Sequence, residues 1–280
     1  MSMIDNVQNL AREWLDSKEV DAIFGLKEQD GYIAPYLFTD VGELSCLVIS
    51  NQYRLCYTCR PAKENILSLM LQTEPNAKIG VVVRGCEERA LIELAKRGQV
   101  DLKRIKILGV ACSKEDAEEC RCEKPYPGNL VLGEKVEGVS GDENVNALLS
   151  KSLPERRAFW KHEFSKCIKC YGCRNVCPMC ICKDCKMEQE LYTETGWLPP
   201  GIPMFHFIRF YHISDRCIGC GECEKACPVD IPLLTIFKLL QKDVKDLFDY
   251  EAGMDVEQEE PLLTTLDETP MREEVMDVGV

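Results

Sequence analysis

The sequence has no apolar run long enough to cross a membrane. A transmembrane helix needs roughly 20 predominantly apolar residues in succession, and the most apolar stretch here, residues 232–240, is interrupted by Lys238. The opening segment, MSMIDNVQNLAREWLDSKEV, shows neither the basic start nor the apolar centre of a secretory signal. We therefore expect a soluble, cytoplasmic protein without a membrane span.

Basic charge is also scarce. The chain has 34 Lys and Arg against 47 Asp and Glu, which gives a formal net charge of −13. Nucleic-acid-binding domains carry a basic face, so we expect no nucleic-acid partner. Ten of the acidic residues fall within residues 251–280, where Arg272 is the only base. We interpret residues 251–280 as a solvated acidic tail, with a docking strip for a partner subunit as the alternative.

The signatures of several common enzyme classes are missing. The sequence contains no P-loop, no G-x-S-x-G and no G-x-G-x-x-G. Only three histidines are present, His162, His206 and His212. The spacing His206-x5-His212 is one that zinc sites use, but the cysteine pairs nearest to it belong to another pattern. We interpret all three histidines as structural and predict no catalytic residue.

Cysteine, in contrast, is abundant, with 18 in 280 residues. Eight of them form two copies of the run C-x2-C-x2-C-x3-C-P, the spacing with which bacterial ferredoxins hold 4Fe–4S clusters. Thiolates are the soft ligands that such clusters require, and the short spacing lets three of them converge from one tight loop. We predict two 4Fe–4S clusters, bound by Cys167, Cys170, Cys173 and Cys177 together with Cys217, Cys220, Cys223 and Cys227.

We expect the fourth cysteine of each run to ligate the cluster of the other run, as in two-cluster ferredoxins. Cluster one would then take Cys227 in addition to the first three cysteines of the first run, and cluster two would take Cys177. The runs are separated by residues 178–216, which are rich in aromatic residues and proline. We expect this insert to pack over the clusters, or alternatively to bind a partner.

Ten cysteines lie outside the two runs. Cys46 sits in an apolar stretch and is interpreted as a buried, inert thiol. Too many thiols are left over to be explained by core packing, so we predict a further cluster. Structural zinc and redox-active C-x-x-C dithiols, such as the pair Cys56 and Cys59, are the alternatives. The candidate ligands of the further cluster are Cys86, Cys112, Cys120, Cys122, Cys182 and Cys185.

Three regions are expected along the chain. Residues 1–150 alternate strand-like and helix-like segments, and β-branched runs at 78–85 and 104–111 flank a helical pattern, as in a βαβ unit. This predicts an α/β domain with a small parallel or mixed sheet, ending in a connecting stretch over 125–152. Residues 151–250 are predicted to form a ferredoxin-like two-cluster domain with a helical C-terminus, and the acidic tail follows. Cys86 and Cys112 come just after the two predicted strands, at the sheet edge where α/β proteins bind ligands.

Several segments resemble the beta subunits of deazaflavin-coenzyme-dependent hydrogenases and formate dehydrogenases. The resemblance covers roughly residues 75–255 and depends on short words in addition to the ferredoxin runs. These words are GVVVRGCEERALIELA at 80–95, ILGVAC at 107–112, RAFW at 157–160, CIKCYGCRNVCPMCICKDC at 167–185, RCIGCGECEKACP at 216–228 and YEAG at 250–253. The family's own additional cluster supports Cys86, Cys112 and the later cysteines as candidate ligands. Longer members hold flavin with an extended N-terminal region, and we expect this sequence to contain only part of that region.

The resemblance implies an electron-transfer iron–sulfur subunit of an anaerobic oxidoreductase complex. Its partners would be protein subunits of the formate dehydrogenase, hydrogenase or heterodisulfide reductase type. Two alternatives stay open. One is a flavin-containing reductase module, with FAD, that acts on a deazaflavin or nicotinamide coenzyme. The other is a sensor of iron or oxygen with a labile cluster.

Overall fold

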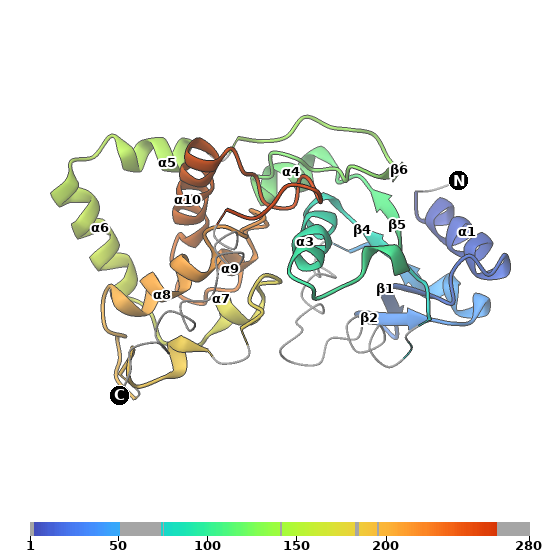
Figure 1. Cartoon of the computed structure of the whole chain (residues 1–280), viewed down its shortest axis with the longest axis horizontal. Coiled ribbons are helices and arrows are strands. Elements are labelled where there is room, and N and C mark those ends of the chain that lie inside the picture. Colours follow the sequence, from blue (N-terminus) through green and yellow to red (C-terminus); the bar gives the residue numbers. More distant parts are fainter. Residues whose placement is uncertain are drawn as a thin grey trace, which may run out of the picture.

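A computed structural model describes residues 3–50, 74, 76–140, 142–182, 185–194 and 196–261. Figure 1 shows two adjoining parts, a sheet flanked by helices and a mainly helical part that contains both cysteine runs. Among the described residues, every helix is too short or too polar to pass through a lipid bilayer. The C-x-x-C pair Cys56 and Cys59, and most of the acidic tail, lie outside the described residues.

The sheet is mixed, as the sequence predicts. Its strands follow the order β2-β1-β4-β5-β6, and β3 also pairs with β1. The pairs β1–β4, β4–β5 and β5–β6 are parallel, whereas β2 and β3 run antiparallel to β1. The strands are β1 (Ala22–Gln29), β2 (Tyr32–Phe38), β3 (Leu47–Val48), β4 (Ile79–Val83), β5 (Ile105–Val110) and β6 (Leu130–Leu132).

Alternate residues of β4 point to opposite faces of the sheet, and each face is covered by a helix. Val82 packs in one cluster of buried residues with α1 (Met3–Asp16), whose Trp14 is buried. Val81 and Val83 pack in a second cluster with α3 (Gly85–Lys96). The expected strand–helix–strand unit is thus β4, α3 and β5. Short helical segments follow at η1 (Val41–Cys46), η4 (Leu102–Arg104) and α4 (Lys114–Cys120).

Residues 125–152 are more structured than a connecting stretch. They contain β6, which extends the sheet beside β5, and α5 (Asp142–Leu149), which packs on α10 (Leu233–Phe248). The expectation of a plain connection was wrong here. Three residues bounded by Asn129 and Gly133 are too few to show the alternation that identifies a strand.

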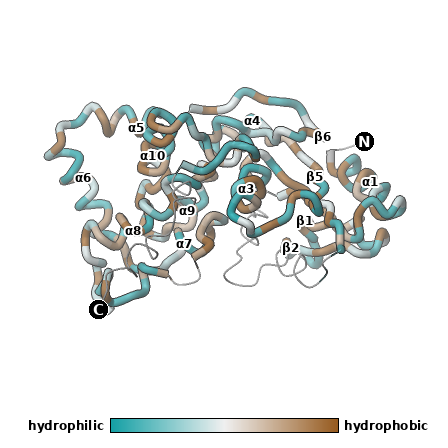
Figure 2. The backbone as a smooth tube through the Cα atoms, in the orientation of Figure 1, coloured by the Kyte–Doolittle hydropathy of each residue, from teal (hydrophilic) through white to brown (hydrophobic). Residues whose placement is uncertain are grey.

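The second part of the chain is built from helices around the cysteine runs. They are α6 (Leu153–Ser165), α7 (Gly172–Asn175), η5 (Lys186–Glu188), α8 (Met204–Ile213), α9 (Glu222–Lys225) and α10 (Leu233–Phe248). Figure 2 shows α6 as mostly hydrophilic, in contrast to the hydrophobic colouring of the sheet. One cluster of buried residues joins the two parts, because Phe24 and Leu91 belong to it together with Ile218 and Phe237.

Candidate functional site

The two cysteine runs fold in the same way. In each run the third cysteine lies in a one-turn helix, α7 or α9. Two positions of each run have a left-handed backbone: Lys169 and Tyr171 in the first, and Gly219 and Gly221 in the second. Glycine adopts this conformation freely, whereas other residues do so at a cost. The repeated backbone indicates that both runs are shaped for the same task.

The runs touch where the first one begins its helix. A side chain at Gly172 would come within 2.8 Å of the carbonyl oxygen of Ala226, the residue before Cys227. Only a residue without a Cβ allows this approach. The contact brings the last cysteine of the second run to the start of the first run.

The structure groups the first three cysteines of the first run with Cys227. Cys167, Cys170, Cys173 and Cys227 all line one small cavity, and side chains of α8, among them Phe205, His206 and Arg209, form part of its wall. Backbone N–H groups point at the sulfurs, because Gly172 donates to Cys170 Sγ at 3.4 Å and Ile231 donates to Cys227 Sγ at 3.5 Å. Such N–H···S contacts are one of the levers by which proteins tune iron–sulfur clusters.

Cys177 lies close to the first three cysteines of the second run, and we call these four the second group. Burial raises the pKa of Cys217, Cys220 and Cys223, to about 12 for Cys217, and Cys177 adds to the rise in each. In the first group burial raises the pKa of Cys173 to about 11. Most of these thiols are therefore at least partly buried, whereas Cys170 is exposed.

Helix α8 forms part of the wall of the first group. Its inner face carries Phe205, His206 and Arg209, all buried and all lining the cavity. Burial lowers the pKa of His206 to about 4, and its Nδ1 has no hydrogen-bond partner among the residues that the structure describes. The outer face carries Met204, which is exposed. Part of the insert therefore packs over this group of thiols, as expected.

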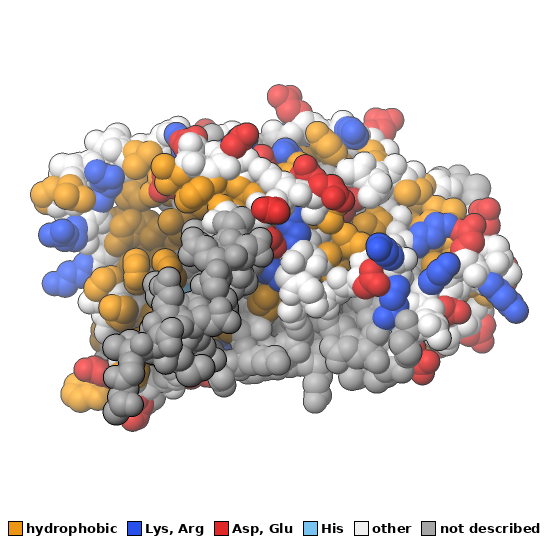
Figure 3. Space-filling model, viewed as in Figure 1, with side chains coloured by type: hydrophobic (Ala, Val, Ile, Leu, Met, Phe, Trp, Pro, Cys, Tyr) orange, Lys and Arg blue, Asp and Glu red, His pale blue; other side chains and the backbone are white. Residues whose placement is uncertain are grey.

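An apolar groove lies behind this wall. It has a volume of about 610 Å³ and is lined by residues of α5, α6, α8 and α10. Figure 3 shows hydrophobic side chains gathered in a hollow over these helices. Phe164 lines the groove and stacks on His206 with ring centroids 4.1 Å apart. A single aromatic layer thus separates the groove from the cavity of the first cysteine group.

The six cysteines predicted for a further cluster divide into two places. Cys86 is the second residue of α3 and lies near enough to Cys220 to raise its pKa. Lys225 contacts Cys120 Sγ at 3.5 Å, and Arg89 contacts Cys122 Sγ at 3.8 Å. These cysteines, with Cys112 after β5, belong to the α/β part of the molecule.

Cys182 and Cys185 lie on the other side of the cysteine runs. Cys182 Sγ is 3.9 Å from His212 Nδ1, and Cys185 forms a hydrogen bond with Arg174. Among the described residues, no three His, Cys, Asp or Glu side chains are arranged to hold a single metal ion. Cys46 is half-exposed at the end of η1, so the expectation of a buried thiol was wrong.

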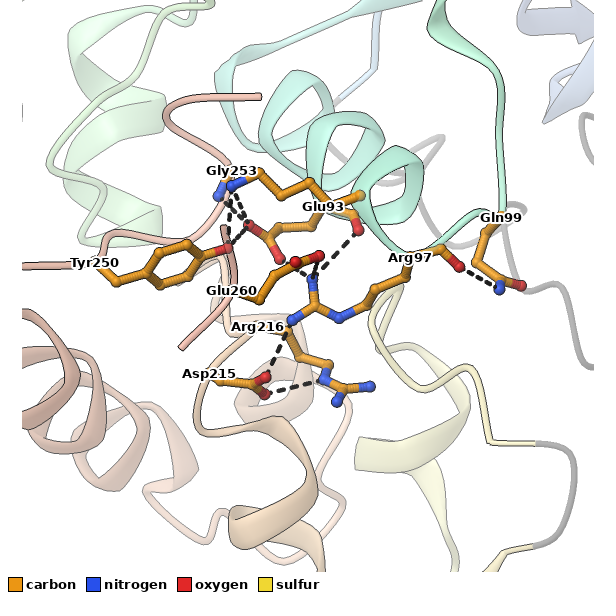
Figure 4. A network of polar contacts seen from close by, with 9 residues as sticks. Glu93, Arg97, Gln99, Asp215, Arg216, Tyr250, Gly253 and Glu260 are labelled. Carbon is orange, nitrogen blue, oxygen red and sulfur yellow. Dashed lines mark hydrogen bonds and ion pairs between the residues drawn. The ribbon is translucent and has the colours of Figure 1, made fainter. Parts of the chain in front are cut away.

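A buried polar network fixes the second run to the α/β part (Figure 4). Arg97, at the end of α3, pairs with Glu93 one turn earlier and with Asp215 at 3.1 Å. Tyr250 donates to Glu93 at 2.5 Å, and Glu260 lies 3.4 Å from Arg97. The network therefore joins α3, the residues just before Cys217 and the segment that follows α10. Sequence reasoning missed this network, and the spacing of Glu93 and Arg97 was its only local signal.

Comparison with known proteins supports an iron–sulfur site. A 4Fe–4S binding domain family matches residues 210–232, which contain the second cysteine run. The ferredoxin-type protein NapG of Escherichia coli is 33% identical over 72 residues, which are 26% of this chain and 28% of NapG.

Two archaeal proteins match a larger share of the chain. The F420-dependent formate dehydrogenase subunit beta of Methanocaldococcus jannaschii is 38% identical over 147 residues, which are 50% of this chain and 38% of that protein. The F420-dependent formate dehydrogenase 1 subunit beta of Methanococcus maripaludis is 36% identical over 149 residues, which are 51% of this chain and 38% of that protein. The chain thus spans less than half the length of either relative. F420 is a deazaflavin, so the expected resemblance to this family of beta subunits is confirmed.

Proposed function

We propose that this chain is an electron-transfer iron–sulfur subunit of an oxidoreductase complex. The single observation that carries the proposal is that two similarly folded four-cysteine runs meet, with Cys227 of the second run lining one cavity with the first three cysteines of the first run. The 4Fe–4S family match and the formate dehydrogenase beta subunits support it. The clusters would carry out the redox step, and the protein would supply their ligands, spacing and surroundings.

The two groups of thiols fit this cofactor. Cys167, Cys170, Cys173 and Cys227 would hold one 4Fe–4S cluster, and Cys217, Cys220, Cys223 and Cys177 the other. Each set is soft, partly buried and close to backbone N–H donors, as iron–sulfur clusters require. Because the two sets share their runs, the clusters would lie side by side and exchange electrons.

The surroundings of the two groups indicate where electrons would enter and leave. Cys170 is exposed, so the first group meets the surface of the molecule. The second group faces the α/β part, where Cys86 lies beside Cys220. We infer a relay with one end at the carboxyl edge of the sheet and the other at Cys170. Partner subunits of the formate dehydrogenase, hydrogenase or heterodisulfide reductase type would dock at these ends.

We also propose the further cluster, now with four candidate ligands. Cys86, Cys112, Cys120 and Cys122 belong to one part of the molecule and would supply a complete set of four thiolates next to the second run. Cys182 and Cys185 would then serve another purpose.

Anaerobic purification with quantification of iron and flavin tests the proposed function. We expect at least eight irons per chain, and twelve would indicate the further cluster. A preparation with no iron, or one whose iron content is unchanged in a C170A/C220A double variant, would contradict the relay. Tightly bound FAD at about one per chain would favour the flavin-containing reductase instead.

A further inference from the structure

Arg209 occupies an unusual place for a charged residue. It projects from α8 into the region between the two cysteine groups, and only 4% of it is exposed. It donates to the carbonyl oxygen of Cys173 at 3.0 Å, lines the cavity of the first cysteine group, and lies close enough to Cys177 for the two to interact electrostatically. Under the proposed ligation these two cysteines serve different clusters. Arg209 therefore lies close to both sites at once.

In the described part of the chain, no Asp or Glu forms an ion pair with Arg209, although Arg97 and Arg174 each have such a partner. Its buried Nε finds no hydrogen-bond acceptor among these residues. An isolated charge in a dry interior is costly. A buried charge of this kind is tolerated where a compensating negative charge is bound nearby.

Nearby thiols are the groups that face this guanidinium. Burial lowers the pKa of Arg209, but Cys177, Cys180 and Cys173 raise it by more, so that the balance lies above the ordinary value. Arg209 in turn lowers the pKa of Cys173, Cys217 and Cys223, in opposition to burial. The influence of this one cation thus reaches thiols of both groups.

We propose that Arg209 is a shared positioning residue that raises the reduction potential of both clusters, an inference that rests on the proposed function. Each cluster becomes more negative by one charge when it gains an electron. A buried cation close to both favours the reduced form of each, and low local screening strengthens the effect. Arginine suits this place because it stays protonated and its planar fork can donate in two directions.

The test is a redox titration of the anaerobically purified full chain, followed by electron paramagnetic resonance. Dithionite supplies the electrons, and Arg209 keeps its proton throughout. R209M keeps the length of the side chain but removes its charge. In this variant the equilibrium constant for one-electron reduction of each cluster should fall about tenfold or more. For a one-electron couple this corresponds to about 59 mV. R209K keeps the charge and should restore most of the loss.

Lys242 offers a control. It lies on α10 with an exposed side chain and belongs to neither cysteine group, so its charge is screened. K242Q should leave both potentials near those of the wild type. If R209M retains its iron and both potentials are unchanged, the inference is wrong while the relay stands. If the wild-type protein itself does not bind two clusters, the proposed function is wrong.

A second readout covers the case in which R209M loses its clusters. In wild-type protein labelled with 15N-arginine, the reduced clusters should show hyperfine coupling to a guanidinium nitrogen. R209K should lack this coupling. If the wild type shows no such coupling, or R209K retains it, Arg209 does not contact the clusters and the inference is overturned.

Discussion

The guanidinium of Arg97 lies 3.1 Å from the carboxylate of Asp215, which stands two residues before Cys217. Both side chains are almost completely buried, with exposed fractions of 3% and 1%. They come from different parts of the molecule, because Arg97 ends α3 and Asp215 leads into the second run. The pair therefore couples the position of the second cysteine group to the α/β part.

Replacement of Asp215 by Asn should loosen this coupling. It leaves a buried guanidinium with less compensating charge, and removal of one partner of a buried pair costs about 3–5 kcal/mol. We expect the free energy of unfolding, measured by anaerobic guanidinium denaturation, to fall by about this amount. The second cluster should be lost earlier than the first as denaturant rises.

Lys245 and Glu251 provide the comparison for this change. They form an ion pair at 3.2 Å near the same segment, but Lys245 is 60% exposed. K245Q should cost about 1 kcal/mol or less. A D215N variant as stable as K245Q would show that the buried network does not hold the two parts together.

Phe164 should protect the first cluster from solvent. It forms the layer between the apolar groove and His206, and it is 5% exposed. Phe164→Ala would open a passage and cost about 3–5 kcal/mol through lost packing. We expect cluster absorbance to bleach several-fold faster in air than in the wild type.

Phe207 gives a control on the same groove. It is 56% exposed on the outer face of α8, so its packing contributes less. Phe207→Ala should bleach at the wild-type rate. Equal rates for all three proteins would mean that Phe164 does not shield the cluster.

An ion pair between β1 and η1 should make the stability of the α/β part depend on pH. Lys27 donates to Glu43 at 2.8 Å, and Tyr36 donates to the same carboxylate at 3.0 Å. These contacts hold the pKa of Glu43 below its ordinary value of 4.5, with the hydrogen bond from Lys27 as the largest cause. The stabilisation is therefore complete above pH 4.5 and is lost as the pH falls through the lower value in the folded protein.

A comparison of the wild type with E43Q measures this effect. The difference in unfolding free energy should be constant at neutral pH and shrink below pH 4.5. In a K27Q background, which lacks the main donor to Glu43, the change to E43Q should show a smaller pH dependence. A difference that grows toward acid pH would contradict the assignment.

The sequence predicts most of this fold where its signals are local. The run of three valines in β4 and the helical spacing of α3 identify the strand–helix–strand unit, and the spacing of the eight cysteines identifies the two runs. The features that the sequence did not predict depend on residues that lie far apart along the chain. Arg209 is one polar residue within an aromatic insert, and nothing near it in sequence indicates that Cys173 and Cys177 will surround it. In the same way, six leftover cysteines do not reveal that they divide into two places.

Serine variants test whether Cys177 and Cys227 each ligate the cluster of the other run. If Cys227 belongs to the first group, C227S should disturb the same cluster as C170S, although the two residues lie in different runs. Likewise C177S should resemble C220S. We expect two classes of electron paramagnetic resonance spectra in the reduced proteins, each with one cluster altered and the other intact.

The exposed end of η1 supplies the control for this experiment. C46S changes a thiol that belongs to neither group, and its iron content and spectrum should match those of the wild type. Ligation within each run predicts the opposite pairing, with C227S resembling C220S and C177S resembling C170S. That pairing would be incompatible with the close contact of Gly172 and Ala226, which carries Cys227 to the first run. The spectra of four single variants therefore decide which sulfurs hold which cluster.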